Sequence, residues 1–163
     1  MIQLIFYTIL LMVSYQDLKK RKIPDFYIVI LFAAGIVYCL TVEHKNPVLE
    51  NFFLNIPEEM GLSERIVGAF CISLPMFLIT FFVPGAFGGG DIKLMAACGF
   101  YLGPVIIVNA AVIGVLFAAI YGAFCILIKK ADKNTRIPMG PFLSMGMLIS
   151  TLWEPALLLF FGL

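Results

Sequence analysis

The chain has 163 residues, of which 62% are hydrophobic and only 13% are charged, with a formal net charge of +1 at pH 7. A soluble domain usually has about 45–50% apolar and about 25% charged residues. A domain of this length cannot bury such an excess of apolar side chains, so the composition excludes an ordinary soluble domain and predicts an integral membrane protein. No nucleic acid is expected among its partners.

Apolar runs predict six membrane segments within one integral-membrane domain that covers residues 1–163. The segments are Ile2–Gln16, Ile23–Val42, Ser63–Val83, Ile92–Leu102, Pro104–Ile128 and Ile137–Phe161. A typical span has about 20 apolar residues, with a range of about 17–25, so the first and fourth segments are short. The two segments that flank Gly103 are alternatively one broken helix. The expected fold is an all-α polytopic membrane protein with about six transmembrane helices.

The distribution of basic residues predicts the orientation of these segments. If the N-terminus lies outside, the loops after segments one, three and five carry nine Lys and Arg residues, and the opposite side carries two. The nine are Lys19, Lys20, Arg21, Lys22, Lys93, Lys129, Lys130, Lys133 and Arg136, and the two are Lys45 and Arg65. Cytoplasmic loops are enriched in Lys and Arg. We therefore expect both termini outside and a multi-pass location in the inner (cytoplasmic) membrane.

The cysteines and the single histidine do not predict a metal site. Cys39, Cys71, Cys98 and Cys125 each stand alone in an apolar stretch, and no Cys-x-x-Cys pair is present. They are interpreted as small buried apolar side chains. His44 lies in a polar loop. Neither a metal nor another cofactor is expected.

Two aspartates at the ends of apolar segments are the candidate functional groups. Asp17 follows the first segment and Asp91 precedes the fourth, so the predicted topology puts both at the cytoplasmic face. An ionisable group near membrane depth is costly and therefore a functional-site candidate. Two such groups predict a carboxylate pair that shares a proton, as in an aspartyl protease. Alternatively, Asp91 caps a helix, and Asp17 belongs to a solvated charge cluster with Lys19 and Lys20 that binds lipid headgroups.

The glycine-rich stretch before Asp91 is the candidate substrate-binding loop. Repeated glycines permit close approach of the backbone and interrupt a helix, which near a membrane requires shelter by protein or water. Gly88, Gly89 and Gly90 are therefore predicted to admit an extended peptide, and Lys93 is assigned to the same loop, where it contacts substrate or lipid phosphates. The alternative is a plain flexible turn. The stretch lacks the spacing of a phosphate-binding loop.

Together, the two aspartate motifs resemble those of the type IV prepilin peptidases, membrane aspartyl proteases with a Gly-x-Gly-Asp motif. Asp17 precedes a basic stretch and Ile23-Pro24-Asp25, where the family usually has Ile-Pro-Asn; Gly88–Lys93 matches Gly-x-Gly-Asp-x-Lys; a late Ile-Pro-x-Gly-Pro element lies at residues 137–141. These three elements cover most of the chain. The resemblance implies catalytic roles for Asp17 and Asp91 and auxiliary roles for Pro24, Asp25, Gly140 and Pro141.

The resemblance also implies an activity and a substrate. The chain is expected to cleave the leader peptide of type IV prepilin or Flp-like pilin precursors at the cytoplasmic membrane face, with the precursor and membrane lipids as partners. Large members also methylate the new N-terminus and carry a Cys-x-x-Cys insertion, but only Leu18–Lys22 separates the first two segments here. Neither methylation nor zinc is therefore predicted. The alternatives are a small ion-coupled transporter and, within the same enzyme class, an archaeal preflagellin peptidase.

Overall fold

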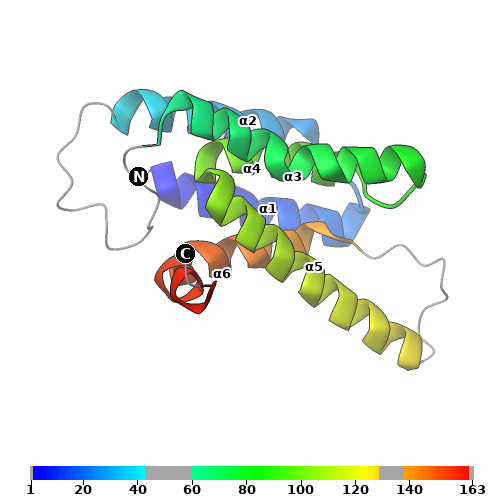
Figure 1. Ribbon diagram of the computed structural model, residues 1–163. Coiled ribbons are helices and arrows are strands. Elements are labelled where there is room, and N and C mark those ends of the chain that lie inside the picture. Colours follow the sequence, from blue (N-terminus) through cyan, green and yellow to red (C-terminus); the bar gives the residue numbers. More distant parts are fainter. Residues whose placement is uncertain (1, 43–59, 129–137, 162–163) are drawn as a thin grey trace.

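The computed structural model describes residues 2–42, 60–128 and 138–161 (Figure 1). Within these ranges the chain forms six helices and no strand. The helices are α1 (Ile2–Lys20), α2 (Asp25–Val42), α3 (Leu62–Phe82), α4 (Gly89–Leu102), α5 (Pro104–Leu127) and α6 (Gly140–Phe161). The predicted all-helical class and the predicted six helices are confirmed for the described residues.

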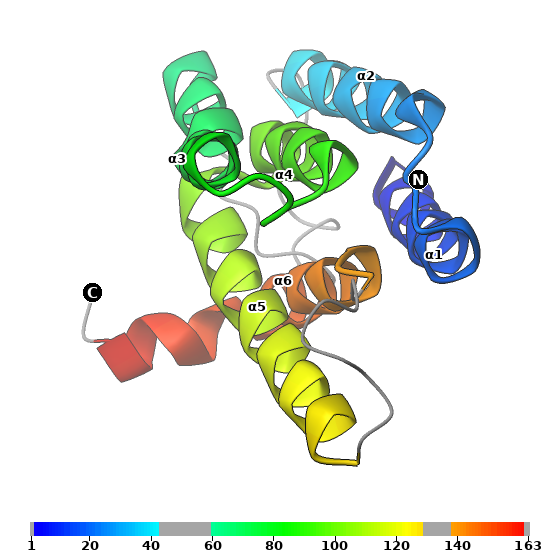
Figure 2. The same cartoon turned by 90° about the vertical axis from the view of Figure 1, so that its right-hand side faces the viewer.

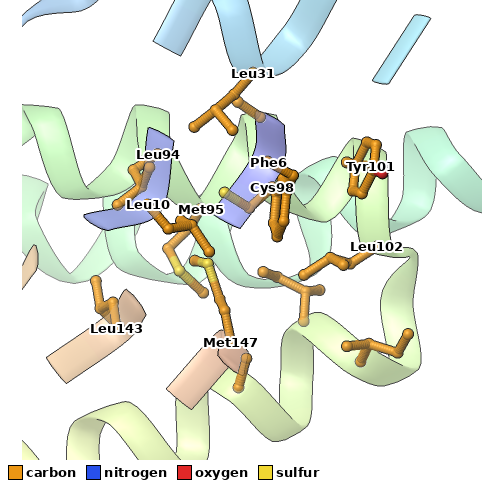
Figure 3. Packing of buried hydrophobic residues seen from close by; sticks show 14 of the residues in the cluster. Phe6, Leu10, Leu31, Leu94, Met95, Cys98, Tyr101, Leu102, Leu143 and Met147 are labelled. Atoms are coloured by element: carbon orange, nitrogen blue, oxygen red, sulfur yellow. The ribbon is translucent and has the colours of Figure 1, made fainter. Parts of the chain in front are cut away.

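Helix α4 is the central helix of the bundle, with the other helices arranged around it (Figure 2). It packs against α2, α3 and α5, and it has only 14 residues, most of them buried. Its buried side chains meet those of α1 and α6 in one apolar core (Figure 3). In this core the Phe6 ring of α1 stacks on the Tyr101 ring of α4, with the centroids 4.6 Å apart. Helix α4 is therefore held in place by packed neighbours on several sides.

Glycines allow α3 and α4 to approach each other closely. A Cβ atom on Gly99 would collide with the backbone of Gly68, and a Cβ on Gly68 would collide with the backbone at Gly99 and Gly103. Close packing through small residues is typical of membrane helices, because lipid gives no hydrophobic driving force between them. This contact fixes the position of α4 against its neighbour.

The outer surface of the described helices is strongly apolar. Large side chains such as Phe82 and Leu127 are 77% and 80% exposed. Soluble monomers rarely expose large contiguous apolar patches. Two of the described helices, α3 and α5, are long and apolar enough to cross a membrane.

The helix ends differ from the predicted segment ends for local reasons. Helix α1 continues past Gln16 to Lys20, and Arg21 ends it with a φ of 51°. Helix α4 begins at Gly89 instead of Ile92, because the first-turn backbone N–H groups have no partner within the helix and the Asp91 side chain caps this end. Gly103, with a φ of 83°, separates α4 from α5, so these are two helices and not one.

Arg65, which the charge count assigns to the side opposite the basic loops, is a buried residue of α3. Arg65 lies in the first turns of α3 and is only 1% exposed. Its Nη1 donates to the carbonyl oxygens of Phe100 and Tyr101 at 3.5 and 3.4 Å, and its guanidinium lies 5.4 Å from the centre of the Tyr38 ring. A cation at a helix C-terminus is favourable, so Arg65 caps α4 at the end opposite Asp91. The basic residues Lys45, Lys129, Lys130, Lys133 and Arg136 lie outside the described residues.

Candidate active site

Asp17 lies in the last turn of α1 and is only 5% exposed. Its Oδ2 accepts a hydrogen bond of 2.8 Å from the backbone N–H of Gly140, the first residue of α6. The N–H groups of a helix N-terminus have no partner within the helix and favour a negative charge. The contact is tight, because a Cβ on Gly140 would lie 2.8 Å from Oδ2 and 3.0 Å from Cβ of Asp17. A residue without a side chain is therefore required at this position.

Asp91 lies in the first turn of α4, before the predicted membrane segment, and is 8% exposed. Its pKa is raised to about 6, because burial and, to a lesser extent, the negative charge of Asp17 outweigh the opposing effect of a hydrogen bond from the Gly88 backbone. Gly88 is the N-cap of α4, so this bond resembles the second half of a capping box. Asp91 therefore caps α4 and also lies within electrostatic reach of Asp17.

Only one oxygen of the Asp91 carboxyl is used by the cap. Its Oδ1 is buried and has no hydrogen-bond partner among the described residues. A cap and a functional carboxyl, which sequence reasoning treats as alternatives, are thus compatible in this geometry. One oxygen anchors the side chain, and the other is left without a partner among the described residues.

Three helix ends meet at this site: the last turn of α1 and the first turns of α4 and α6. Each N-terminal turn contributes backbone donors to one carboxyl group, Gly140 to Asp17 and Gly88 to Asp91. Two nearby buried carboxyls cannot both ionise cheaply, so one keeps a proton while the other is charged. The arrangement can therefore supply an acid and a base within electrostatic reach of each other, as the activation of water requires.

Lys93 and Asp25 form an ion pair of their own. The Lys93 Nζ lies 2.7 Å from Asp25 Oδ1, and the two side chains are 58% and 70% exposed. Exposed ion pairs contribute only about 0–1 kcal/mol to stability. The geometry therefore gives this third carboxylate a local bond to Lys93.

The remaining predicted site residues have different local surroundings. Gly88 lies against the Asp91 carboxyl, Gly90 lies against Ile23, and a Cβ on Gly89 would meet no atom within 4 Å. Two of the predicted loop glycines are thus the first residues of α4. Pro141 is the second residue of α6, where proline is tolerated, and the Pro24 carbonyl accepts the Tyr27 N–H at 3.2 Å. Within the described part of the chain, no three His, Cys, Asp or Glu side chains gather to hold a metal ion.

The comparisons with known proteins all point to one family. The family model described as the type IV leader peptidase family matches residues 4–123. The prepilin leader peptidase/N-methyltransferase of Bacillus subtilis is 27% identical over 96% of this chain and 57% of its own length. The protein of the same name from Aeromonas salmonicida is 25% identical over 89% of this chain and 46% of its own length. The chain thus spans about half the length of these relatives. No solved structure matches it significantly.

Proposed function

The chain belongs to the type IV leader peptidase family, and from this premise we propose that it is a membrane-embedded aspartyl endopeptidase. Its substrates are the leader peptides of type IV prepilin or pilin-like precursors. The observation that carries the proposal is the buried Asp91 carboxyl, whose pKa is raised to about 6 by burial and by Asp17. Such a pair is suited to hydrolysis of a peptide bond without a metal.

The two carboxyls take different roles in this mechanism. Asp91 keeps its proton to higher pH, and Asp17, which accepts the Gly140 N–H, is the ionised partner. Asp17 removes a proton from water, and the water oxygen forms a bond to the scissile carbonyl carbon. The Asp91 O–H hydrogen-bonds to the developing oxyanion and gives it a proton, which returns to Asp91 when the carbonyl re-forms. The C–N bond then breaks, and the amine leaves with the proton that Asp17 took up.

We also propose that all six helices cross the membrane, with both termini outside and the carboxyl pair at the cytoplasmic face. The exposed apolar surface and the two long apolar helices support a membrane location. Lys19 and Lys20 in the last turn of α1 and Lys93 near the start of α4 lie at the same ends of the helices as Asp17 and Asp91. Cytoplasmic ends are typically basic. Carboxyls in terminal turns suit a site at the membrane face better than a proton path through its middle.

The proposal takes over only the peptidase part of the relatives' names. An acid and a base near each other supply what hydrolysis needs, but they give no reason to expect methyl transfer. The released N-terminus should therefore carry no added methyl group. Mass spectrometry of the cleaved product measures both the position of the cut and any methylation.

A cleavage assay tests the proposed function. The purified protein, in detergent or lipid, is incubated with pilin precursors from the same genome, and products are mapped by mass spectrometry. Cleavage at the junction between leader and apolar segment is expected. If an intact, folded preparation cleaves none of the precursors, the proposed function is wrong.

The raised pKa of Asp91 predicts how activity depends on pH. Because the mechanism needs Asp91 protonated, kcat/KM should fall about tenfold per pH unit once the pH exceeds the upper pKa of the pair in the free enzyme. That pKa should lie near 6. A pH–rate profile with the detergent held constant measures this limb. A profile that is flat from pH 5 to pH 9 would contradict the assigned roles.

The same pKa predicts an effect on stability. A carboxyl whose pKa is raised on folding stabilises the protein fully below its unfolded pKa, and this stabilisation is lost as pH rises through the folded pKa. For Asp91, a rise from 3.8 to about 6 corresponds to roughly 3 kcal/mol. Asp91→Asn should therefore become more stable relative to the wild type between about pH 4 and pH 6 and keep that advantage above pH 6. Thermal unfolding of both proteins across this range measures the difference.

A further inference from the structure

The two carboxyls belong to helices that have different main neighbours. Helix α1 packs mainly against α6 and α2, whereas α4 packs against α2, α3 and α5. Helix α2 is thus the main neighbour that both share, and it lies beside both of them (Figure 2). Because Asp17 is carried by α1 and Asp91 by α4, the separation of the two carboxyls depends on how α2, and the residues that lead into it, join these helices.

Residues 21–24 form the α1–α2 linker, which is short and stiff. Arg21 ends α1 with a φ of 51°, and its N–H donates to the carbonyl oxygen of Asp17 at 2.8 Å. Pro24 has a fixed φ and restricts the backbone of Ile23 before it, and α2 begins directly after the proline. A displacement at Ile23 is therefore passed on to the last turn of α1, where Asp17 lies.

The linker and the first residue of α2 contact one face of α4. Ile23 is half-buried against the apolar core, and a Cβ on Gly90 would lie 3.0 Å from Cβ of Ile23 and 3.6 Å from its backbone nitrogen. Asp25 Oδ1 accepts a hydrogen bond of 2.7 Å from Lys93 Nζ. Gly90 and Lys93 are three residues apart and so lie on the same face of the helix. We call these two contacts, Ile23 on Gly90 and Asp25 on Lys93, the linker junction.

The linker junction touches both halves of the carboxyl pair. Asp17 lies one turn before the linker, and Asp91 directly follows Gly90. We propose that the linker junction is a positioning element that sets the separation of Asp17 and Asp91. The inference rests on the proposed peptidase function. The residues of the junction take no part in the chemistry and act only through the two aspartates, whose placement matters because an error of about 1 Å can lower a rate by about 10²-fold.

Gly90→Ala tests the fit of the linker against α4. The added Cβ would meet Ile23 at less than the ordinary contact distance of 3.4–4 Å, so the linker must move away by several tenths of an ångström. Gly89→Ala is the matched comparison, because it makes the same change in the same turn and its Cβ would meet nothing within 4 Å. On a purified precursor, kcat of Gly90→Ala should be at least about tenfold below that of Gly89→Ala, with similar KM values.

The pH–rate profile separates positioning from a loss of stability. The charge of Asp17 contributes to the raised pKa of Asp91, and a Coulomb interaction weakens with distance. Wider separation should therefore lower the upper pKa of the pair, so that kcat/KM begins to fall at a lower pH in Gly90→Ala than in Gly89→Ala. Neither substitution alters a charge. A protein that was merely less stable would keep the wild-type limb of the profile.

The ion pair of the junction gives a second test that does not depend on the glycine. Asp25→Ala removes the acceptor for Lys93, whereas Asp25→Asn keeps an oxygen acceptor and loses the charge. Asp25→Ala should lower kcat by about threefold, within the range expected for the loss of an exposed ion pair, and Asp25→Asn should restore most of this loss. Equal losses in the two variants would mean that Asp25 acts through its charge, and the inference would be overturned.

The remaining outcomes are equally distinct. Equal kcat values for Gly90→Ala and Gly89→Ala would overturn the inference. A raised KM with an unchanged kcat in Gly90→Ala would also overturn it, because the junction would then bind the precursor. Thermal unfolding shows whether each variant is folded, and if Gly90→Ala is not, the Asp25 variants decide the question. A folded wild type that cleaves no precursor would instead overturn the proposed function, and the inference with it.

Discussion

Asp17→Asn and Asp91→Asn should each reduce the rate of precursor cleavage by about 10²–10⁴-fold, because each removes one of the two proton-transferring groups. An amide in place of Asp17 cannot take a proton from water. An amide in place of Asp91 still donates a hydrogen bond but cannot pass on a proton. The measurement is kcat/KM on a purified pilin precursor, with products resolved by mass spectrometry.

A matched control separates loss of chemistry from loss of folding. Glu64→Gln makes the same carboxyl-to-amide change at an exposed position in the first turn of α3, which lies away from the pair. It should retain wild-type activity. All variants should insert into the membrane and unfold at temperatures close to or above that of the wild type. Processing above about one tenth of the wild-type rate by either aspartate variant, with folding intact, would exclude the paired-carboxyl mechanism.

Helix number and order follow from the sequence, because long apolar runs interrupted by Gly, Pro and charge clusters leave few alternatives. The ends are less predictable, since a helix does not stop where apolar residues stop. Helix α1 extends through Asp17 to Lys20, which puts the carboxyl on a rigid turn instead of in a loop. Helix α4 begins within the glycine stretch at Gly89, and this makes Asp91 its natural cap.

The residues and contacts of the site are only partly predictable from the sequence. The spacing of the motifs predicts that Asp17 and Asp91 share one membrane face, but no local pattern predicts that the Gly140 N–H binds Asp17, because that contact joins the first helix to the last. The burial of Arg65 is only weakly indicated by the sequence. Gly68, Ala69, Ser73 and Met76 follow it at helical spacing and are all buried with it, so Arg65 lies on the packed face of α3.

The burial of Asp91 lowers the stability of the folded protein. A carboxyl that is 8% exposed and lies near a second carboxyl destabilises the folded protein whenever it is ionised. The well-packed α4, closely fitted to α3 through Gly68 and Gly99, offsets that cost. The same rigidity keeps the two carboxyls at a fixed separation, which general acid–base catalysis requires.

Gly140→Ala should lower kcat by roughly 10²-fold, the effect expected when a reacting group is displaced by about 1 Å. The added Cβ would lie 2.8 Å from Oδ2 and 3.0 Å from Cβ of Asp17, closer than ordinary contact, so the carboxylate must move. The substitution leaves both aspartates present. It should therefore change kcat much more than KM, because it displaces a reacting group and removes no side chain that could bind the precursor.

Gly61→Ala is the control for this substitution. Gly61 precedes α3, and a Cβ there would meet only the Ser63 hydroxyl oxygen at the ordinary distance of 3.6 Å. Its activity should equal that of the wild type. Equal kcat values for Gly140→Ala and Gly61→Ala would mean that Asp17 does not need the α6 N-terminus. The site would then depend on α1 and α4 alone, and Gly140 would be only the residue that begins α6.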